Sequence, residues 1–340
     1  MNAKKLFELL TSMRASIVLL ITLGIIASFG TIIPQGYSND VILEQYGSYL
    51  GQLILVLGLD DLYHAWWFIA LGMLLFAQVL ICTFRRMKKV RSVRQLGSIV
   101  IHLSFMIVLC GAFASFLTGT HEVINASIGE TVNLSEKDLA STSVTVNDFS
   151  IDYYDQGIAS QYYCDLTYKD KNGNTTNKDI SVNHPFSKGG IKIYQQSFGW
   201  ESEVTLSLDG KNDKQVIRDG DSIDLGDGKT LQVFFLPDYD EQSQTLESKS
   251  NKPNNPVLVA GILSSDGSVS DMVLLHPNET QAMLNGTITF DRYALYTVLN
   301  VKHDRSVGII FTGFIVATLG LILRYLPFGK RKKEEENGVR

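Results

Sequence analysis

Four long apolar segments constrain this 340-residue chain more than any other feature of its sequence. They are residues 17–33, 65–84, 97–118 and 307–323, and none of them contains Asp, Glu, Lys or Arg. Each approaches the roughly 20 apolar residues that an α-helix needs to cross the hydrocarbon core of a bilayer. The sequence therefore predicts a membrane protein with four transmembrane helices, at about residues 16–33, 65–84, 97–118 and 306–327.

The distribution of positive charge predicts how these helices are oriented. Short loops rich in Lys and Arg remain in the cytoplasm. Basic residues lie before the first apolar segment, between the second and the third, and after the fourth, at Lys4–Arg14, Arg85–Arg94 and Lys330–Lys333. We therefore expect both termini to be cytoplasmic, with a charged tail at 328–340, in the cytoplasmic (inner) membrane of a bacterium.

Residues 39–58, between the first and second apolar segments, form a further candidate helix. Ser38 or Asn39 can cap its start. Apolar residues then recur at helical spacing, namely Ile42, Leu43, Tyr46, Leu50, Leu53, Ile54 and Leu57. This pattern is typical of an amphipathic helix that lies in the membrane interface. We expect it on the outer surface, as part of a membrane domain that comprises residues 1–118.

The segment between the third and fourth helices, residues 119–305, has a different pattern. Short runs such as Tyr162–Tyr168 alternate in polarity with period two, and dipeptides such as Asn172-Gly173 separate them. These features favour antiparallel strands joined by tight hairpins, in a sandwich or barrel-like sheet. The segment holds 27 of the 35 acidic residues but only 15 of the 30 basic ones. We therefore expect an extracytoplasmic, mainly antiparallel β-rich domain that does not bind nucleic acid.

His102 is the ionisable residue inside the third apolar segment. An imidazole in hydrocarbon must find a hydrogen bond, a metal or another ring. At about 100° per residue, Gly111 lies on the opposite side of the helix from His102. Four apolar residues share the side of His102, namely Phe105, Met106, Leu109 and Phe113. This face could form half of a haem cleft, and the alternative is a buried, hydrogen-bonded structural histidine.

The depth of His102 limits its possible partners. It lies about five residues from the cytoplasmic end of its helix, or about 8 Å into the membrane. His64, His121 and His303 flank the helices at the opposite surface, more than about 20 Å away. Because they cannot share a metal with His102, a bis-histidine haem would need its second ligand from another protein. The sequence leaves the role of these three outer histidines open.

Motifs of a self-contained enzyme, such as a catalytic triad or a phosphate-binding glycine loop, are not recognisable in this sequence. The chain also lacks Cys-x-x-Cys-His, the motif for covalent haem attachment. A haem, if bound, would therefore be held without thioether bonds. The chain is accordingly not expected to be an enzyme by itself.

Several segments resemble the ResB (CcsB-type) family of cytochrome c biogenesis proteins. In chain order they are Leu10–Arg14, Gly30–Gln35, Tyr63–Phe68, Cys82–Arg86, Ile101–Ser104, Asn183–Phe186 and Tyr194–Ser197. The resemblance spans all four helices in the right order, together with scattered points of the β-rich domain. The chain departs from the family where it has Asp304-Arg305-Ser306 instead of Asp-Pro-Gly before the last helix, and it is short for the family.

The resemblance implies a subunit of a membrane complex that transports haem b and presents it for attachment to apocytochrome c outside the cytoplasm. The implied partner is a ResC (CcsA-type) membrane protein, with which the chain would form a cytochrome c synthase. In this reading His102 is an axial ligand of the transported, non-covalently bound haem iron, opposite a histidine of the partner. Phe105, Met106, Leu109 and Phe113 would be its apolar haem face.

Two other classes of function remain open from the sequence. An electron-transfer subunit with a resident haem b would normally need a pair of intramembrane histidines in one chain, and only His102 is present. A membrane-anchored sensor or binding module would hold its ligand in the β-rich domain. In that case the change His102→Ala would leave function intact.

Overall fold

The computed structural model describes residues 12–326, apart from 89, 137–138, 209–210, 244, 266–267 and 284–285. The basic clusters at Lys4–Lys5 and Lys330–Lys333, and the predicted tail at 328–340, lie outside the described residues. The chain divides into two compact units. One is helical and comprises the chain up to Thr118 together with the chain from Arg305 onward, whereas the other is β-rich and comprises Gly119–Asp304.

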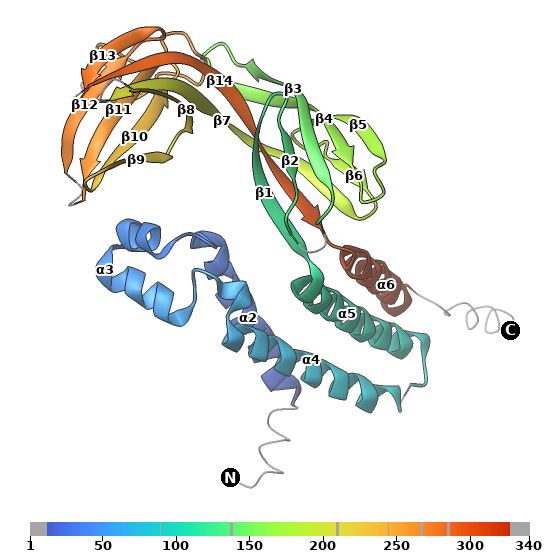
Figure 1. Ribbon diagram of the computed structural model, residues 1–340. Helices are drawn as coiled ribbons and strands as arrows, with labels where there is room; N and C mark the ends of the chain where they lie inside the picture. The colour runs from blue at the N-terminus through green and yellow to red at the C-terminus, as the bar shows by residue number, and fades with distance from the viewer. Residues whose placement is uncertain are drawn as a thin grey trace, which may run out of the picture. The chain divides into compact units, whose positions relative to one another are not determined.

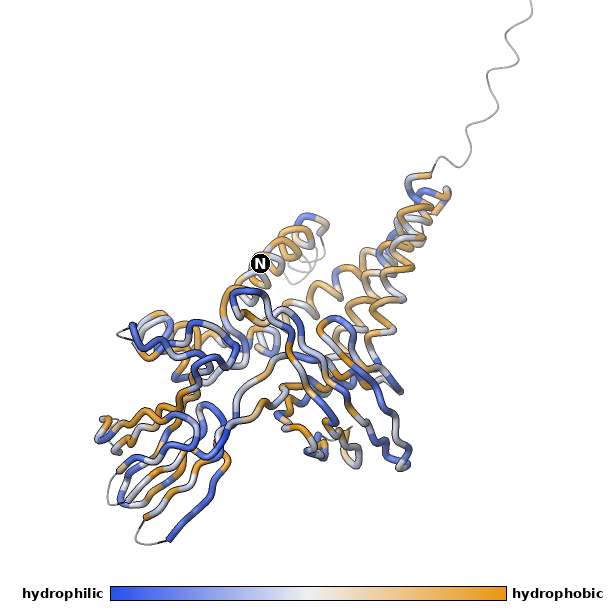
Figure 2. Tube along the Cα trace, turned by 90° about the horizontal axis from the view of Figure 1, so that it is seen from above, coloured by the Kyte–Doolittle hydropathy of each residue, from blue (hydrophilic) through white to orange (hydrophobic). Residues whose placement is uncertain are grey.

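The helical unit contains the four predicted spanning helices, which the structure confirms as helices long and apolar enough to cross a membrane. They are α2 (Met13–Ile32), α4 (Trp66–Met87), α5 (Val93–Thr118) and α6 (Val307–Tyr325). The side chain of Ser12 caps α2 by accepting a hydrogen bond from the backbone N–H of Ala15. Apolar residues crowd along these helices, whereas polar and apolar residues alternate along the strands (Figure 2).

Helices α5 and α6 pack closely because small residues line their contact. Gly97, Ser104 and Gly111 are buried on α5 and follow one another at intervals of seven residues. A Cβ atom on Gly97 would lie only 2.5 Å from the backbone nitrogen of Arg324. A Cβ atom on Gly313 of α6 would likewise lie 2.5 Å from a side-chain carbon of α5. This spacing lets the two backbones approach, as small residues do in membrane helix pairs.

Helix α3 (Asn39–Leu57) differs from the single interfacial helix that the sequence predicts. Its backbone breaks at Gly47, where φ is +74°, and the chain folds back on itself (Figure 1). The second half packs on the first, since a Cβ atom on Gly51 would lie 2.9 Å from the side chain of Leu43. Ile42 and Ile54 are buried in this small helical hairpin. Glycine alone adopts such a φ without steric cost, which explains where the helix breaks.

Fourteen described strands build the β-rich unit around two long ones. Strands β7 (Ile191–Leu208) and β14 (Gly286–His303) pair antiparallel along their whole length (Figure 1). The other strands are β1 (Thr120–Ser127), β2 (Thr131–Asn133), β3 (Ser143–Tyr153), β4 (Ala159–Lys169), β5 (Thr175–Ser181), β6 (Phe186–Lys188), β8 (Lys211–Arg218), β9 (Ser222–Gly226), β10 (Lys229–Leu236), β11 (Val257–Ser264), β12 (Val269–Leu275) and β13 (Glu279–Met283). All pairings between these strands are antiparallel, so the expected antiparallel β-rich domain is confirmed.

The strands form three sheets and two hydrophobic cores instead of one sandwich. The central sheet has the order β1-β14-β7-β6, with β13 also paired to β14 and β8 to β7. One half of the long β7–β14 pair packs against the sheet β2-β3-β4-β5, and the other half packs against β12-β11-β10-β9. Phe198 and Leu295 pack against both cores. The unit is therefore a pair of sandwich lobes that share the long strand pair β7–β14.

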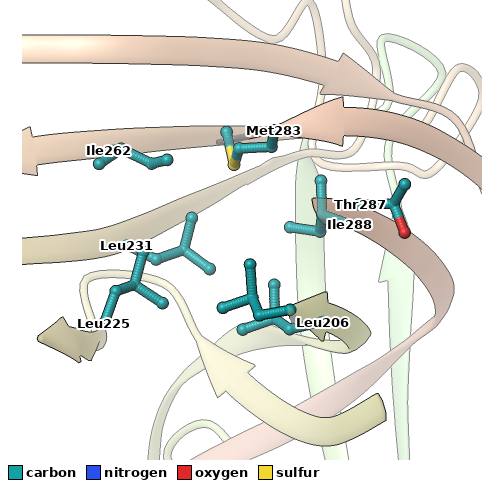
Figure 3. A pocket seen from close by; sticks show the side chains of 8 residues that line it. Leu206, Leu225, Leu231, Ile262, Met283, Thr287 and Ile288 are labelled. Carbon is teal, nitrogen blue, oxygen red and sulfur yellow. The ribbon is translucent and has the colours of Figure 1, made fainter. Parts of the chain in front are cut away.

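The second lobe is tightly packed between its two sheets. Apolar side chains from both sheets, including Leu206, Leu231 and Ile262, point toward one another and leave a void of only about 10 Å³ (Figure 3). A single buried water needs about 10–15 Å³ and polar partners. Among the described residues that line it, this void is therefore part of a packed core.

Glu203 anchors the central sheet through a charged network on β7. Its carboxylate accepts hydrogen bonds from the guanidinium of Arg292, at 2.7 and 2.9 Å, and pairs with the ammonium of Lys214. Both partners lie on the neighbouring strands β14 and β8. The hydrogen bonds from Lys214 and Arg292 lower the pKa of the Glu203 carboxyl below its usual value.

Candidate functional site

His102 lies on α5 with its imidazole oriented by the backbone of its own helix. Its Nδ1 atom is 2.9 Å from the carbonyl oxygen of Ser98, one turn earlier. Because a carbonyl oxygen can only accept, Nδ1 carries the proton and donates. The remaining nitrogen, Nε2, then holds a lone pair that is free to bind a metal.

The Nε2 atom of His102 faces helix α4. The Sγ atom of Cys82 lies 3.9 Å from it, within range of a weak S–H···N hydrogen bond. Both side chains are half-buried. Cys82 is the site residue that reasoning from the sequence missed, because 20 positions separate it from His102 and only the packing of α4 on α5 brings them together. The signal was present, since Cys82 opens one of the segments that resemble the ResB family.

A second contact between α4 and α5 holds the turn that carries His102. The guanidinium of Arg86 donates a hydrogen bond to the hydroxyl of Ser98, with Nη1 and Oγ 2.9 Å apart. The Ser98 carbonyl is the acceptor for His102, and the preceding residue, Gly97, packs against α6. One turn of α5 is therefore fixed by both neighbouring helices, which sets the direction of the imidazole.

The predicted apolar face around His102 lies on the part of α5 that is not occupied by α6. Phe105, Met106 and Leu109 are half-buried, and Phe113 is exposed. The buried small residues Ser104 and Gly111 face α6 instead. The apolar face therefore lies away from α6, on the side of α5 where Cys82 of α4 meets His102.

The other histidines lie in different places. His64 precedes α4, and its ring packs at 5.2 Å against Phe116 near the far end of α5. Phe116 follows His102 by 14 residues, which is about 21 Å along a helix. His121 of β1 lies directly opposite Lys302 of β14, so these two side chains share one face of the sheet. His303 is the next residue after Lys302, and its side chain therefore points to the other face.

The described residues contain no group of three or more His, Cys, Asp or Glu side chains that could hold a bare metal ion. Cys164 is buried in the first β core, and burial raises the pKa of its thiol to about 12. It is therefore a packed, unreactive side chain.

The remaining motif residues of the first helix have structural roles. Gln35 donates hydrogen bonds from Nε2 to the carbonyl oxygens of Ile33 and Leu59, at 2.9 and 2.8 Å. Its Oε1 accepts one from the backbone N–H of Leu62, at 3.0 Å. A Cβ atom on Gly30 would lie 2.9 Å from the side chain of Leu62. The motif therefore ties the end of α2 to the segment that enters α4.

The motif residues of the β-rich unit are structural as well. Asn183 has φ of +68°, in the left-handed region that Asn tolerates, and it turns the chain between Ser181 and His184. The buried Gln195 accepts a hydrogen bond from Thr297 and donates one to the carbonyl of Ser197. This pair lies where the register of β7 and β14 shifts by one residue.

Comparison with known proteins places these features in a family context. The model of the ResB-like family matches residues 13–94 and 91–290. Cytochrome c biogenesis protein Ccs1 of Guillardia theta is 23% identical, over 96% of this chain and 91% of that protein. Cytochrome c biogenesis proteins CcsB of Picosynechococcus sp. and Thermosynechococcus vestitus are each 25% identical, over 94% and 98% of this chain and 83% and 90% of their own lengths.

Proposed function

Because this chain belongs to the ResB-like family, we propose that it is a membrane subunit of the machinery that matures cytochrome c, and that it carries haem toward the site of attachment. Two observations support this role. The family match covers both structural units. The similar proteins are named cytochrome c biogenesis proteins, and the similarity extends over most of their lengths. The chain has no catalytic motif of its own, so it acts as part of a complex.

The observation that carries the proposal is the orientation of His102. Its Nδ1–H is held by the Ser98 carbonyl, and Nε2 keeps its lone pair. Metal-binding histidines commonly donate their second ring N–H to a carbonyl or carboxylate, which fixes the tautomer. His102 thus fits one axial position of a haem iron. Haem b, the cargo, is bound without covalent attachment.

The surroundings of His102 fit a porphyrin on one side of the helix. Phe105, Met106, Leu109 and Phe113 supply an apolar surface that does not face α6. The Cys82 thiol lies beside Nε2, at 3.9 Å. Binding of the iron therefore requires the Cys82 side chain to turn away from the imidazole.

A partner protein must provide the second axial ligand. The sequence contains six histidines, and His102 is the one inside an apolar segment. A ResC (CcsA-type) membrane protein with its own intramembrane histidine would complete the coordination. The β-rich unit lies outside the cytoplasm in this scheme, where it meets the apocytochrome, and both termini are cytoplasmic.

The proposal is tested by co-expressing the chain with a ResC-type partner and an apocytochrome, with and without the change His102→Gly. We expect the variant complex to lose most of its haem and to form little holocytochrome, and added imidazole to restore both. The matched control is His184→Gly, an exposed histidine in a loop of the β-rich unit. Unchanged haem content in the His102→Gly complex contradicts the proposal.

A further inference from the structure

A second oriented imidazole lies at the opposite end of α4 and α5 from His102. The Nδ1 atom of His64 is 2.5 Å from Oδ1 of Asp61, in the short 3₁₀ turn η1 (Leu62–His64) that precedes α4. The backbone N–H of His64 also donates to the carbonyl of Asp61, at 3.1 Å. The carboxylate accepts from Nδ1–H, so the lone pair of the neutral imidazole is on Nε2, and the side chain is 61% exposed.

The turn that carries His64 is fixed to the rest of the helical unit. Leu62 is fully buried, and its backbone N–H donates to Gln35. The hydroxyl of Tyr63 donates to the carbonyl of Ala27 on α2, at 3.2 Å. The position of His64 is therefore set by packing and hydrogen bonds before any ligand binds, as an effective metal ligand requires.

The surface next to His64 consists of aromatic rings. Phe116 of α5 packs against the imidazole with ring centroids 5.2 Å apart, and Phe113 stacks on Phe116 at 6.4 Å. Both phenylalanines are exposed on their other sides, as are Tyr63 and Trp66. A hydrated metal ion would need several polar ligands, which this surface lacks among its described residues. A flat, apolar macrocycle that carries its own metal fits both the imidazole and the rings.

We propose that His64 is a second haem-iron ligand of this chain, and that Asp61 is its positioning residue. The inference rests on the proposed function, since it takes haem as the cargo. Asp61 fixes the tautomer of His64 and makes Nε2 a stronger donor to the iron. Phe116, which packs against the imidazole, contacts the porphyrin. Because Phe116 lies about 21 Å along α5 from His102, the same two helices present one haem ligand toward each membrane surface.

The test is a titration of the purified full-length chain, reconstituted in lipid nanodiscs, with haemin. The absorbance and electron paramagnetic resonance spectra report histidine-ligated iron, and they are compared for wild type, His102→Gly, His64→Ala and the double variant. We expect wild type to bind two haems per chain, each single variant one, and the double variant none. His121→Ala, an exposed histidine without a carboxylate partner, is the matched control and should bind as wild type does.

Asp61→Asn separates positioning from general folding. In the His102→Gly background, we expect this change to weaken haemin binding by about 10–100-fold and to raise the midpoint potential of the bound iron, because the amide stabilises ferric iron less than the carboxylate does. An unchanged potential and affinity would overturn the role of Asp61.

Two outcomes distinguish the present inference from the function on which it rests. If wild type binds one haem and His102→Gly binds none, the proposed function stands and the His64 site is wrong. In that case the aromatic surface contacts lipid or a partner helix. If wild type binds no haem at all, the His64 site is wrong, and the proposed function is then decided by the haem content of the complex with the ResC-type partner.

Discussion

The change Gly97→Ala probes the packing that orients His102. The added Cβ atom would lie 2.5 Å from the backbone nitrogen of Arg324, and 2.9 Å from both the Cα atom of Arg324 and the carbonyl oxygen of Gly320. Ordinary van der Waals contact begins at 3.4 Å, so the shortest distance is about 0.9 Å too small. All three atoms belong to backbone, and the clash cannot be relieved by rotating a side chain. Helix α6 must therefore move away from α5.

The expected cost follows from two opposing effects. Overpacking of this kind costs about 1–3 kcal/mol, whereas replacing Gly by Ala in a helix gains about 0.5–1 kcal/mol. The net loss of stability is therefore about 0–2.5 kcal/mol. Gly24→Ala on α2 is the matched control, because nothing lies within 4 Å of a Cβ atom there. It should be neutral or slightly stabilising.

The free energy of unfolding of both variants can be measured in mixed micelles with increasing fractions of a denaturing detergent. The same samples, loaded with haemin together with the ResC-type partner, should show weaker haem retention for Gly97→Ala, because Ser98 and His102 lie on the turn of α5 that loses its contact with α6. Equal stability of Gly97→Ala and Gly24→Ala would refute the close approach of α5 and α6.

Three further changes test other parts of the structure. Phe290→Ala should destabilise the β-rich unit by about 3–5 kcal/mol, because Phe290 is fully buried in the second core. The matched change Phe234→Ala, at a half-exposed residue, should reduce stability far less, and thermal unfolding compares the two variants. Because its basic partners lower the pKa of Glu203, the stability that Glu203 contributes is present above the usual pKa of a glutamate and is lost as the pH falls through its depressed folded-state pKa. Urea midpoints measured from pH 7 to 3 should fall less steeply for Glu203→Gln, and parallel curves would contradict this. Ser98→Ala removes the hydroxyl that Arg86 contacts but keeps the carbonyl that accepts from His102. The complex should therefore retain its haem, while detergent titrations show a loss of about 1 kcal/mol of stability. Loss of haem would show that the hydroxyl, too, orients the imidazole.

The membrane helices could be predicted from the sequence because their signal is local. Long apolar runs without charge have few other solutions, and helical phase placed Gly111 on the side opposite His102, where the structure has α6. The break in α3 was not predictable in the same way. Gly47 lies within a continuous helical pattern, and glycine is tolerated there in a straight helix as well as in a kinked one. The burial of Ile42 against Ile54 decides between them.

The arrangement of the β-rich unit depends on contacts between distant residues. Period-two alternation identifies individual strands. It does not predict that β7 pairs with β14, nearly 100 positions later, or that this strand pair contributes to two hydrophobic cores. The pairing of Cys82 with His102 is of the same kind, because it depends on which face of α4 meets α5. The Asp61–His64 pair is local, three residues apart, but its meaning depends on the rings that α5 brings beside it.

The most direct test of the central claim is the coordination of the iron in the complex with the ResC-type partner, measured by electron paramagnetic resonance at low temperature. The His64→Ala background removes the other proposed ligand of this chain, so that His102 can be observed alone. The account predicts a low-spin, bis-histidine ferric signal with His102 present, a high-spin signal in His102→Gly, and a return to low spin on addition of imidazole. A low-spin signal that is identical with and without His102 would contradict it.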